Sequence, residues 1–65
     1  MSIKLINAVQ SYISDRRQPL QQAVQDGVAK DYAEYQKLCG EIRGLTVVEE
    51  YLKDLAKRLE QDDDE

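Results

Sequence analysis

Few side chains in this sequence could carry out chemistry. Histidine is absent and Cys39 is the single cysteine, so the chain has neither a Ser-His-Asp set nor the ligands of a structural zinc site. Cys39 has no local base to activate its thiol, and we interpret it as a small packing residue. The adjacent carboxylates Glu49 and Glu50 would point in different directions on a helix, so they do not form a shared acid–base site. We therefore expect a protein that is not an enzyme, with no cofactor, metal or small-molecule substrate.

The charged residues do not favour a nucleic-acid partner either. The basic doublet Arg16–Arg17 cannot supply the phosphate contacts that useful affinity requires. The net charge is −4, and the segment from Glu60 to Glu65 carries five of the acids. We expect residues 61–65 to form a disordered acidic tail that aids solubility. The alternative is that this tail docks on a basic surface or is repelled by nucleic acid.

The length of the chain points to assembly with other proteins. Sixty-five residues make one domain, expected here over residues 1–60, and such a domain is marginally stable alone. Without a disulfide or a metal, packing against another protein or against copies of itself remains as the means of stabilisation. No apolar run approaches the roughly 20 residues that span a bilayer, and the N-terminus lacks a long apolar signal segment. We expect the chain to be made and used in the cytoplasm, or in a particle assembled there, and to have no membrane partner.

The second half of the chain predicts a long amphipathic helix over about residues 31–60. Asp31 can cap this helix, and Glu34 three residues later completes a capping-box pattern. Its apolar stripe, with a period close to 3.5 residues, consists of Leu38, Ile42, Leu45, Val48, Leu52, Leu55 and Leu59. A parallel zipper dimer is an alternative, but Glu49 would be unfavourable in its seam. The pattern therefore favours packing against the first half of the same chain.

The first half also reads as a helix, with Ser2 as its cap. Ile6, Val9 and Ile13 line one face, and Leu20 and Val24 continue the same phase.

Pro19 interrupts the first helix, because it cannot donate a hydrogen bond to the Asp15 carbonyl. Either one kinked helix covers about residues 3–26 or Pro19 opens a second helix; the preserved phase favours the kink. Gly27 is a helix stop, and residues 27–30 form the turn. The sequence thus predicts an all-α, antiparallel helical hairpin with a kinked first helix and a long second helix.

Two glycines inside the second helix require an explanation. Gly40 and Gly44 each cost a helix about 1 kcal/mol relative to alanine, and their spacing places them on one face, away from the leucines. We interpret that face as one where the backbone of a neighbouring protein approaches closely. The alternatives are a bend or break near Gly44, or no particular role.

The four tyrosines extend the expected interface. Tyrosine is enriched in the centres of interfaces, and a thin hairpin cannot bury Tyr12, Tyr32, Tyr35 and Tyr51 internally. Two of them are expected at half-buried core edges. The predicted protein interface comprises Tyr32, Tyr35, Gly40, Gly44 and Tyr51.

A resemblance covers most of the chain. An amphipathic helix containing "R-x-x-L" is followed by "DYAEY", by "CGEIRGL" and by a charged helix with an acidic end. This order resembles small helical proteins encoded in the virion-assembly region of tailed bacteriophages. The resemblance implies a structural protein of the phage particle, present in many copies and bound to capsid, portal or neck proteins. The alternatives are an assembly helper that leaves the particle, such as a scaffold or DNA-packaging factor, and a cytoplasmic regulator that binds one protein.

Overall fold

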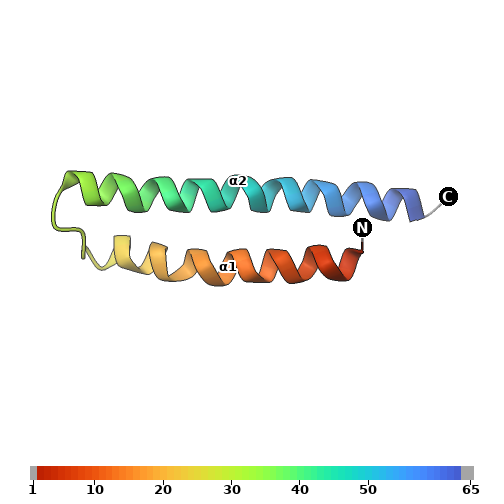
Figure 1. The fold of residues 1–65 in the computed structure, drawn as a ribbon, viewed down its shortest axis with the longest axis horizontal. Coiled ribbons are helices and arrows are strands. Elements are labelled where there is room, and N and C mark those ends of the chain that lie inside the picture. The colour runs from red at the N-terminus through yellow and green to blue at the C-terminus, as the bar shows by residue number, and fades with distance from the viewer. Residues whose placement is uncertain (1, 64–65) are drawn as a thin grey trace.

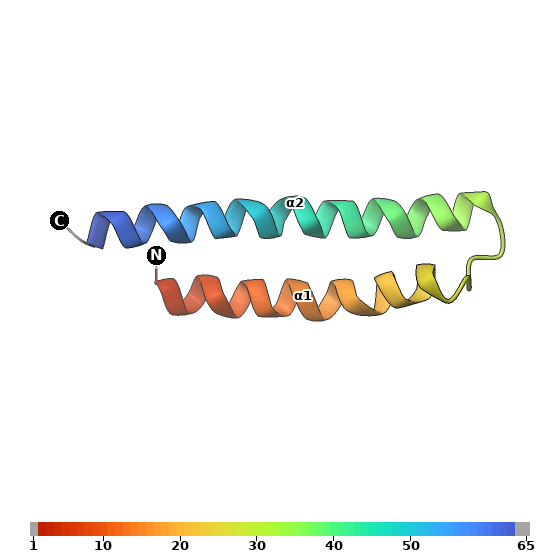
Figure 2. The ribbon, with the colours of Figure 1, turned by 180° about the vertical axis from the view of Figure 1, so that it is seen from behind.

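The computed structural model describes the backbone of residues 2–63 and the side chains up to Glu60. Helix α1 covers Ile3–Gln25 and helix α2 covers Tyr32–Asp63. The two helices lie side by side and antiparallel, joined by one short turn (Figures 1 and 2). The predicted all-α hairpin is confirmed.

Each helix begins directly after a residue whose side chain caps it. The Ser2 hydroxyl accepts hydrogen bonds from the backbone N–H groups of Lys4 and Leu5, at 3.1 and 3.4 Å. At the start of α2, Asp31 Oδ1 accepts from the Glu34 N–H at 2.8 Å. Glu34 Oε2 in turn accepts from the N–H of Lys30 at 3.3 Å. The expected capping box is therefore present, but its return bond reaches one residue before the cap.

The turn begins with a glycine that adopts a left-handed conformation. Gly27 has φ +68°, a value that side-chain-bearing residues rarely adopt. Its N–H donates to the Val24 carbonyl at 3.1 Å, and the Val28 N–H donates to the Ala23 carbonyl at 3.2 Å. This pair of bonds is the Schellman motif, which satisfies carbonyls that the helix end leaves unpaired.

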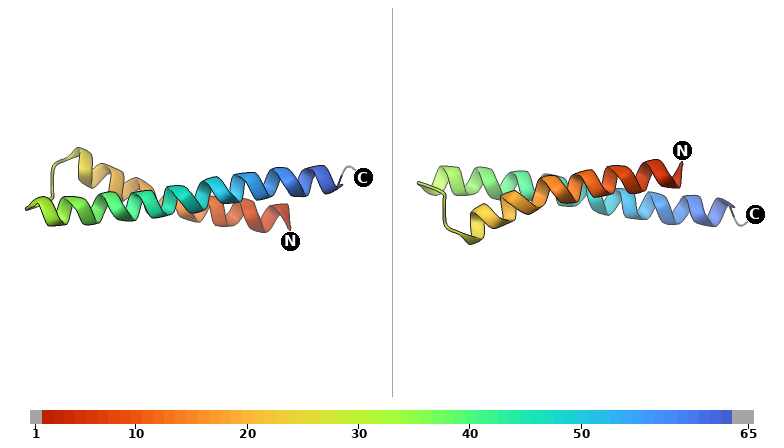
Figure 3. Two further views of the ribbon diagram at one scale, coloured as in Figure 1. Left: turned by 90° about the horizontal axis from the view of Figure 1, so that it is seen from above. Right: turned by 90° about the horizontal axis from the view of Figure 1, so that it is seen from below.

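The proline does not break the first helix. Pro19 lies inside α1, which is one continuous helix rather than two. Figure 3 shows the last turns of α1, drawn in yellow, veering away from α2, as expected where a proline removes a helical hydrogen bond. The kinked form that the preserved apolar phase favoured is therefore the observed one.

The C-terminal boundary of α2 differs from the prediction. The helix continues to Asp63, three residues beyond the expected end at residue 60. The first three residues of the expected acidic tail, 61–63, are therefore helical, and residues 64–65 lie outside the described part. Loss of apolar periodicity at Glu60 does not end a helix by itself, because the sequence from there to Asp63 contains neither glycine nor proline to stop it.

The helices meet along a seam with alternating spacings of three and four residues. Its buried or half-buried members on α1 are Ile3, Ile6, Gln10, Ile13, Arg17, Leu20 and Val24. Those on α2 are Leu38, Ile42, Leu45, Glu49, Leu52, Ala56 and Leu59. This is the spacing of a coiled coil, here closed within one chain.

Little of the chain is fully buried. Among the described residues, only Ile6 and Ile13 form a buried apolar core, with 1% and 6% of their surface exposed. The molecule measures 53 × 15 × 15 Å, with a radius of gyration of 15.2 Å, whereas a compact chain of this length would have about 11 Å. A two-helix rod cannot enclose a larger core.

Two valines assigned to the seam lie outside it. Val9 and Val48 are both exposed, so their placement in the core-facing stripes is wrong. Each valine comes one residue before a seam position in the sequence, so its side chain points to the flank of the seam. They belong instead to a neighbouring face of the hairpin.

Candidate interaction surface

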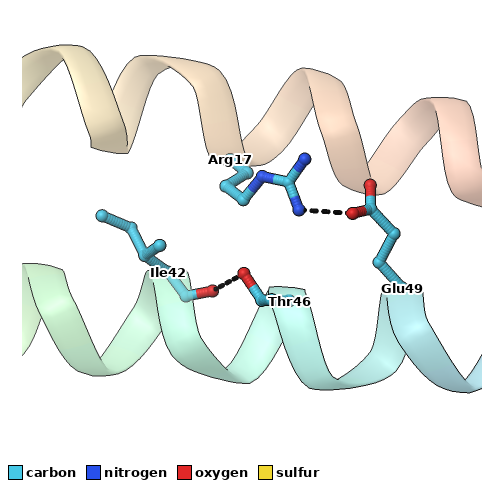
Figure 4. Close-up of polar contacts among 4 residues, drawn as sticks. All are labelled: Arg17, Ile42, Thr46 and Glu49. Atoms are coloured by element: carbon cyan, nitrogen blue, oxygen red, sulfur yellow. Dashed lines mark hydrogen bonds and ion pairs between the residues drawn. The ribbon is translucent and has the colours of Figure 1, made fainter.

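An ion pair crosses the middle of the seam. Arg17 Nη1 donates to Glu49 Oε1 at 2.6 Å, and the side chains retain only 18% and 13% of their exposure. In Figure 4 Arg17 extends from α1 along the helix direction to reach Glu49 on α2. Beside the pair, the hydroxyl of Thr46 donates to the Ile42 carbonyl at 2.9 Å, so this polar group is satisfied within its own helix.

The surroundings of this pair favour the charged state of Glu49. The hydrogen bond from Arg17 lowers the pKa of the Glu49 carboxyl, and the charges of Arg17 and Lys53 act in the same direction against partial desolvation. Arg17 Nε is buried and has no hydrogen-bond partner among the described residues. The pair therefore neutralises two charges within the seam, but one donor remains unsatisfied.

The sequence contained a signal for this pair that we did not use. Arg17 follows Ile13 by four residues and Glu49 follows Leu45 by four, so both occupy seam positions. Two opposite charges that interrupt two apolar stripes are candidates to form an ion pair with each other when the stripes pack together. Glu49, which argued against a zipper dimer, is instead neutralised within the hairpin.

A shallow groove lies along one side of the seam. Residues of both helices line it, namely Arg16, Leu20, Glu41, Gly44, Leu45 and Val48. Because these residues line one groove, Arg16 of α1 lies alongside the stretch of α2 from Gly44 to Val48. This pairing gives the register of the two helices on this side.

The groove continues into an exposed apolar face toward the chain ends. Val9 lies seven residues before Arg16, while Tyr51 and Leu55 lie seven after Gly44 and Val48. Seven residues are close to two helical turns, so these side chains share one side and one level of the hairpin. The members of this apolar side face are Leu5, Val9, Tyr12, Val48, Tyr51 and Leu55.

Most of this face is open to solvent. Tyr12, Val48 and Tyr51 expose 63%, 47% and 58% of their surface, Leu5 and Val9 are also exposed, and Leu55 is half-buried. Five of the nine large hydrophobic side chains that the described residues expose therefore lie on this one face. Such clustering marks an interaction site more strongly than scattered exposed residues do.

The opposite side of the hairpin is polar. On α1 it carries Lys4, Asn7, Ser11, Ser14, Gln18 and Gln21. On α2 it carries Cys39, Thr46, Glu50, Lys53 and Lys57. Because this side is polar, the exposed apolar residues along the seam are gathered on the other side of the hairpin.

The structure separates the two predicted interface glycines. A Cβ added at Gly40 or at Gly44 would meet nothing within 4 Å, so the hairpin itself does not use the space they leave. Both lie inside the continuous helix α2, which excludes a break at Gly44. Gly44 lines the groove, whereas Gly40 does not. Contact of either glycine with a neighbouring protein stays a prediction.

The predicted tyrosines also fall into two groups. Tyr32 and Tyr35 stack near the turn, with ring centroids 6.4 Å apart, and Gln36 donates a hydrogen bond to the Tyr32 hydroxyl. Hydrogen bonding with the Cys39 thiol raises the pKa of Tyr35. Tyr51 lies far along α2, on the apolar side face.

All four tyrosines are exposed, so the expectation of two half-buried ones is wrong. A two-helix rod has too few layers to cover them. Of the predicted interface residues, Gly44 and Tyr51 lie on the side of the groove, whereas Tyr32 and Tyr35 form a separate pair near the turn. Tyr12 and Val48, which complete the surroundings of Gly44 and Tyr51, were not in the predicted set.

Other kinds of site receive no support from the described residues. They contain no group of three or more potential metal ligands, and neither helix has a stretch long and apolar enough to cross a bilayer.

Fold and surface together define a helical hairpin with a coiled-coil seam and one exposed apolar side. Neither protein-family models, curated proteins nor solved structures gave a match to this chain.

Proposed function

We propose that this hairpin is a non-enzymatic assembly protein that works by packing its helices against other protein surfaces. The observation that carries this proposal is the apolar side face, exposed on one side of a rod whose opposite side is polar. Monomeric proteins rarely expose large contiguous apolar patches unless these bind something. The aromatic side chains Tyr12 and Tyr51 on this face are of a type enriched at the centres of interfaces.

The finer proposal places the protein in the particle of a tailed bacteriophage. It rests on the resemblance of the "DYAEY" and "CGEIRGL" segments to small proteins of virion assembly. In this setting the hairpin is an accessory structural component, held by capsid, portal or neck proteins in many copies. A rod 53 Å long and 15 Å wide has a shape that fits along a groove between larger subunits.

Mass spectrometry of purified particles tests this placement. The particles are prepared from cells that produce either the wild-type chain or a chain with Val48→Glu, which puts a charge on the apolar side face. We expect the wild-type chain to remain in mature particles and the variant to be depleted. Ser11→Glu is the matched control, because it adds the same charge at an exposed position on the opposite, polar side of the hairpin.

The other outcomes separate the rival functions. A chain found in immature particles and missing from mature ones would identify an assembly helper. A chain missing from both, but recovered with one non-structural protein, would identify a regulator. Equal incorporation of the Val48 and Ser11 variants would exclude the apolar side face as the attachment site.

A further inference from the structure

We propose that the apolar side face binds the same face of a second copy, making a four-helix bundle. The two copies are related by a two-fold axis parallel to the helices, so that α1 of each lies on α2 of the other. The proposed function requires a protein partner for the apolar side face. This inference rests on that function and names a second copy of the chain as the partner. The argument for a second copy comes from the register, the charges and the exposed area.

The register makes the face complementary to itself. The apolar residues occupy the same levels on both helices, with Tyr12 near Val48, and Val9 near Tyr51 and Leu55. Under this two-fold axis, Tyr12 meets Val48 of the second copy and Val9 meets its Leu55. Every apolar level then faces an apolar level. Every neighbouring pair of helices is antiparallel, as in up-and-down four-helix bundles.

The charges at the groove select this orientation. Arg16 and Glu41 are exposed, lie on different helices and line the same groove. Neither takes part in an ion pair among the described residues. In the parallel arrangement, Arg16 approaches the segment of the second copy that contains Glu41 and Gly44. The missing side chain of Gly44 leaves space there for the long arginine.

The opposite stacking direction lacks this complementarity. A two-fold axis perpendicular to the helices would also bring the apolar levels together. It would, however, lay α2 of each copy on α2 of the other, so that Arg16 of one copy would lie far from Glu41 of the second. Only the parallel arrangement brings these two opposite charges together, so the charges favour it.

The exposed area is consistent with a missing partner of this size. The chain exposes 5151 Å², whereas a folded monomer of this mass exposes about 4,200 Å². The excess of roughly 900 Å² is close to the ~800 Å² that each partner buries in an interface of standard size. A second hairpin of the same length would cover the side face along most of its extent.

The oligomeric state in solution tests the proposal, by analytical ultracentrifugation of the full chain over micromolar to millimolar concentrations. We expect the wild type to be a dimer at the upper end of this range. Val48→Glu should raise the dimer dissociation constant about tenfold or more, because it buries an unpaired charge. Ser11→Glu, on the polar side, should leave it unchanged, and circular dichroism should show equal helicity for all three. A wild-type chain that stays monomeric at millimolar concentration would overturn the proposal.

Charge exchange tests the orientation separately. Arg16→Glu and Glu41→Arg should each weaken the dimer several-fold, and the double variant should recover most of the loss. Absence of recovery would overturn the parallel arrangement. A monomeric wild type combined with loss of Val48→Glu from particles would reject the dimer and leave the proposed function standing. A dimer combined with absence from every particle and every structural partner would do the reverse.

Discussion

The two ends of the hairpin are held together by different means. At the open end, where α1 begins, Ile6 is the one fully buried side chain among the described residues, and Ile13, 6% exposed, continues this core to the middle of α1. At the turn end, Leu20 and Val24 are only half-buried. There the contacts are local hydrogen bonds: the Schellman motif around Gly27 and the caps at the start of α2.

The difference follows from connectivity. At the turn end a short loop keeps the helices close, so little entropy is lost when they pack there. The open end is separated from this loop by the full length of both helices, so the loop does not keep the helices close there. Burial of apolar surface must hold them together instead. The same end carries the apolar side face, which further packing could cover. The ion pair of Arg17 and Glu49 lies between the two regions.

The largest expected effect is at the open end. Ile6→Ala should lower the free energy of unfolding by about 2–5 kcal/mol, the usual cost of emptying a buried site. Leu20→Ala removes the same number of carbon atoms from a half-buried site at the turn end, and should cost less than half as much. Urea unfolding at one fixed chain concentration measures both. Equal losses would show that the two ends are held by burial alike.

Pro19 should weaken the region next to the turn. Pro19→Ala restores an N–H that can donate to the Asp15 carbonyl, and should raise the free energy of unfolding by about 2 kcal/mol. This value combines a cost of about 3 kcal/mol for an interior proline with up to about 1 kcal/mol that proline saves by restricting the unfolded chain. Gln18→Ala, at the neighbouring exposed position, is the control and should change stability little. A loss of stability in the Pro19 variant would mean that the kink is needed for packing.

Replacement of glycine by alanine should have opposite effects on the stability of the folded chain at Gly27 and at Gly40. Gly27→Ala should destabilise by about 1 kcal/mol, because φ is +68° and alanine disfavours that region. Gly40→Ala should stabilise the free chain by about 1 kcal/mol, since Gly40 is helical and nothing lies within 4 Å of an added Cβ. Thermal unfolding of both variants measures the contrast. Destabilisation by Gly40→Ala would support the alternative that this glycine permits a bend in α2.

Sequence reasoning succeeded where the rules are local. The cap at Ser2, the stop at Gly27 and the continuity of the helix through Pro19 each depend on residues within one or two turns. The assignment of Val9 and Val48 to the core failed, because a stripe of apolar residues can be read in two phases that differ by one position. Only the register between the helices decides which phase is buried.

The candidate site depended on the same missing information. The sequence placed Gly44 and Tyr51 in an interface, but not Tyr12 or Val48 beside them, since these come together across or along the helices in a particular register. The pairing of Arg17 with Glu49 needed it too. That register is set by the geometry of the turn and by the packing of the whole seam, and no short motif records it.

The smallest expected effect concerns acid stability in the middle of the seam. The hydrogen bond and charge of Arg17 hold the pKa of Glu49 below its ordinary value of 4.5, so the unfolded chain takes up this proton more readily than the folded one. The stabilisation from Glu49 is therefore complete above about pH 4.5 and is lost as the pH falls through the lower, folded-state value. Other carboxylates titrate in the same range, so the wild type must be compared with Glu49→Gln, in which this proton is absent. The difference between their melting temperatures should be largest at pH 7 and should shrink toward pH 3.

Arg17→Gln decides whether the ion pair is the cause. Without the guanidinium, partial desolvation acts on Glu49 with only Lys53 to oppose it, so the pKa of Glu49 should rise. In this background, we again compare the melting temperatures of chains that keep Glu49 and chains with Glu49→Gln. Their difference should no longer depend on acid, or should depend on it in the opposite direction. The reason is that protonation stabilises the folded chain when folding raises the pKa of a carboxyl. A pH dependence that survives Arg17→Gln unchanged would assign the effect to Lys53. The two ends of the hairpin would then be linked by packing alone, with no contribution from the charged pair between them.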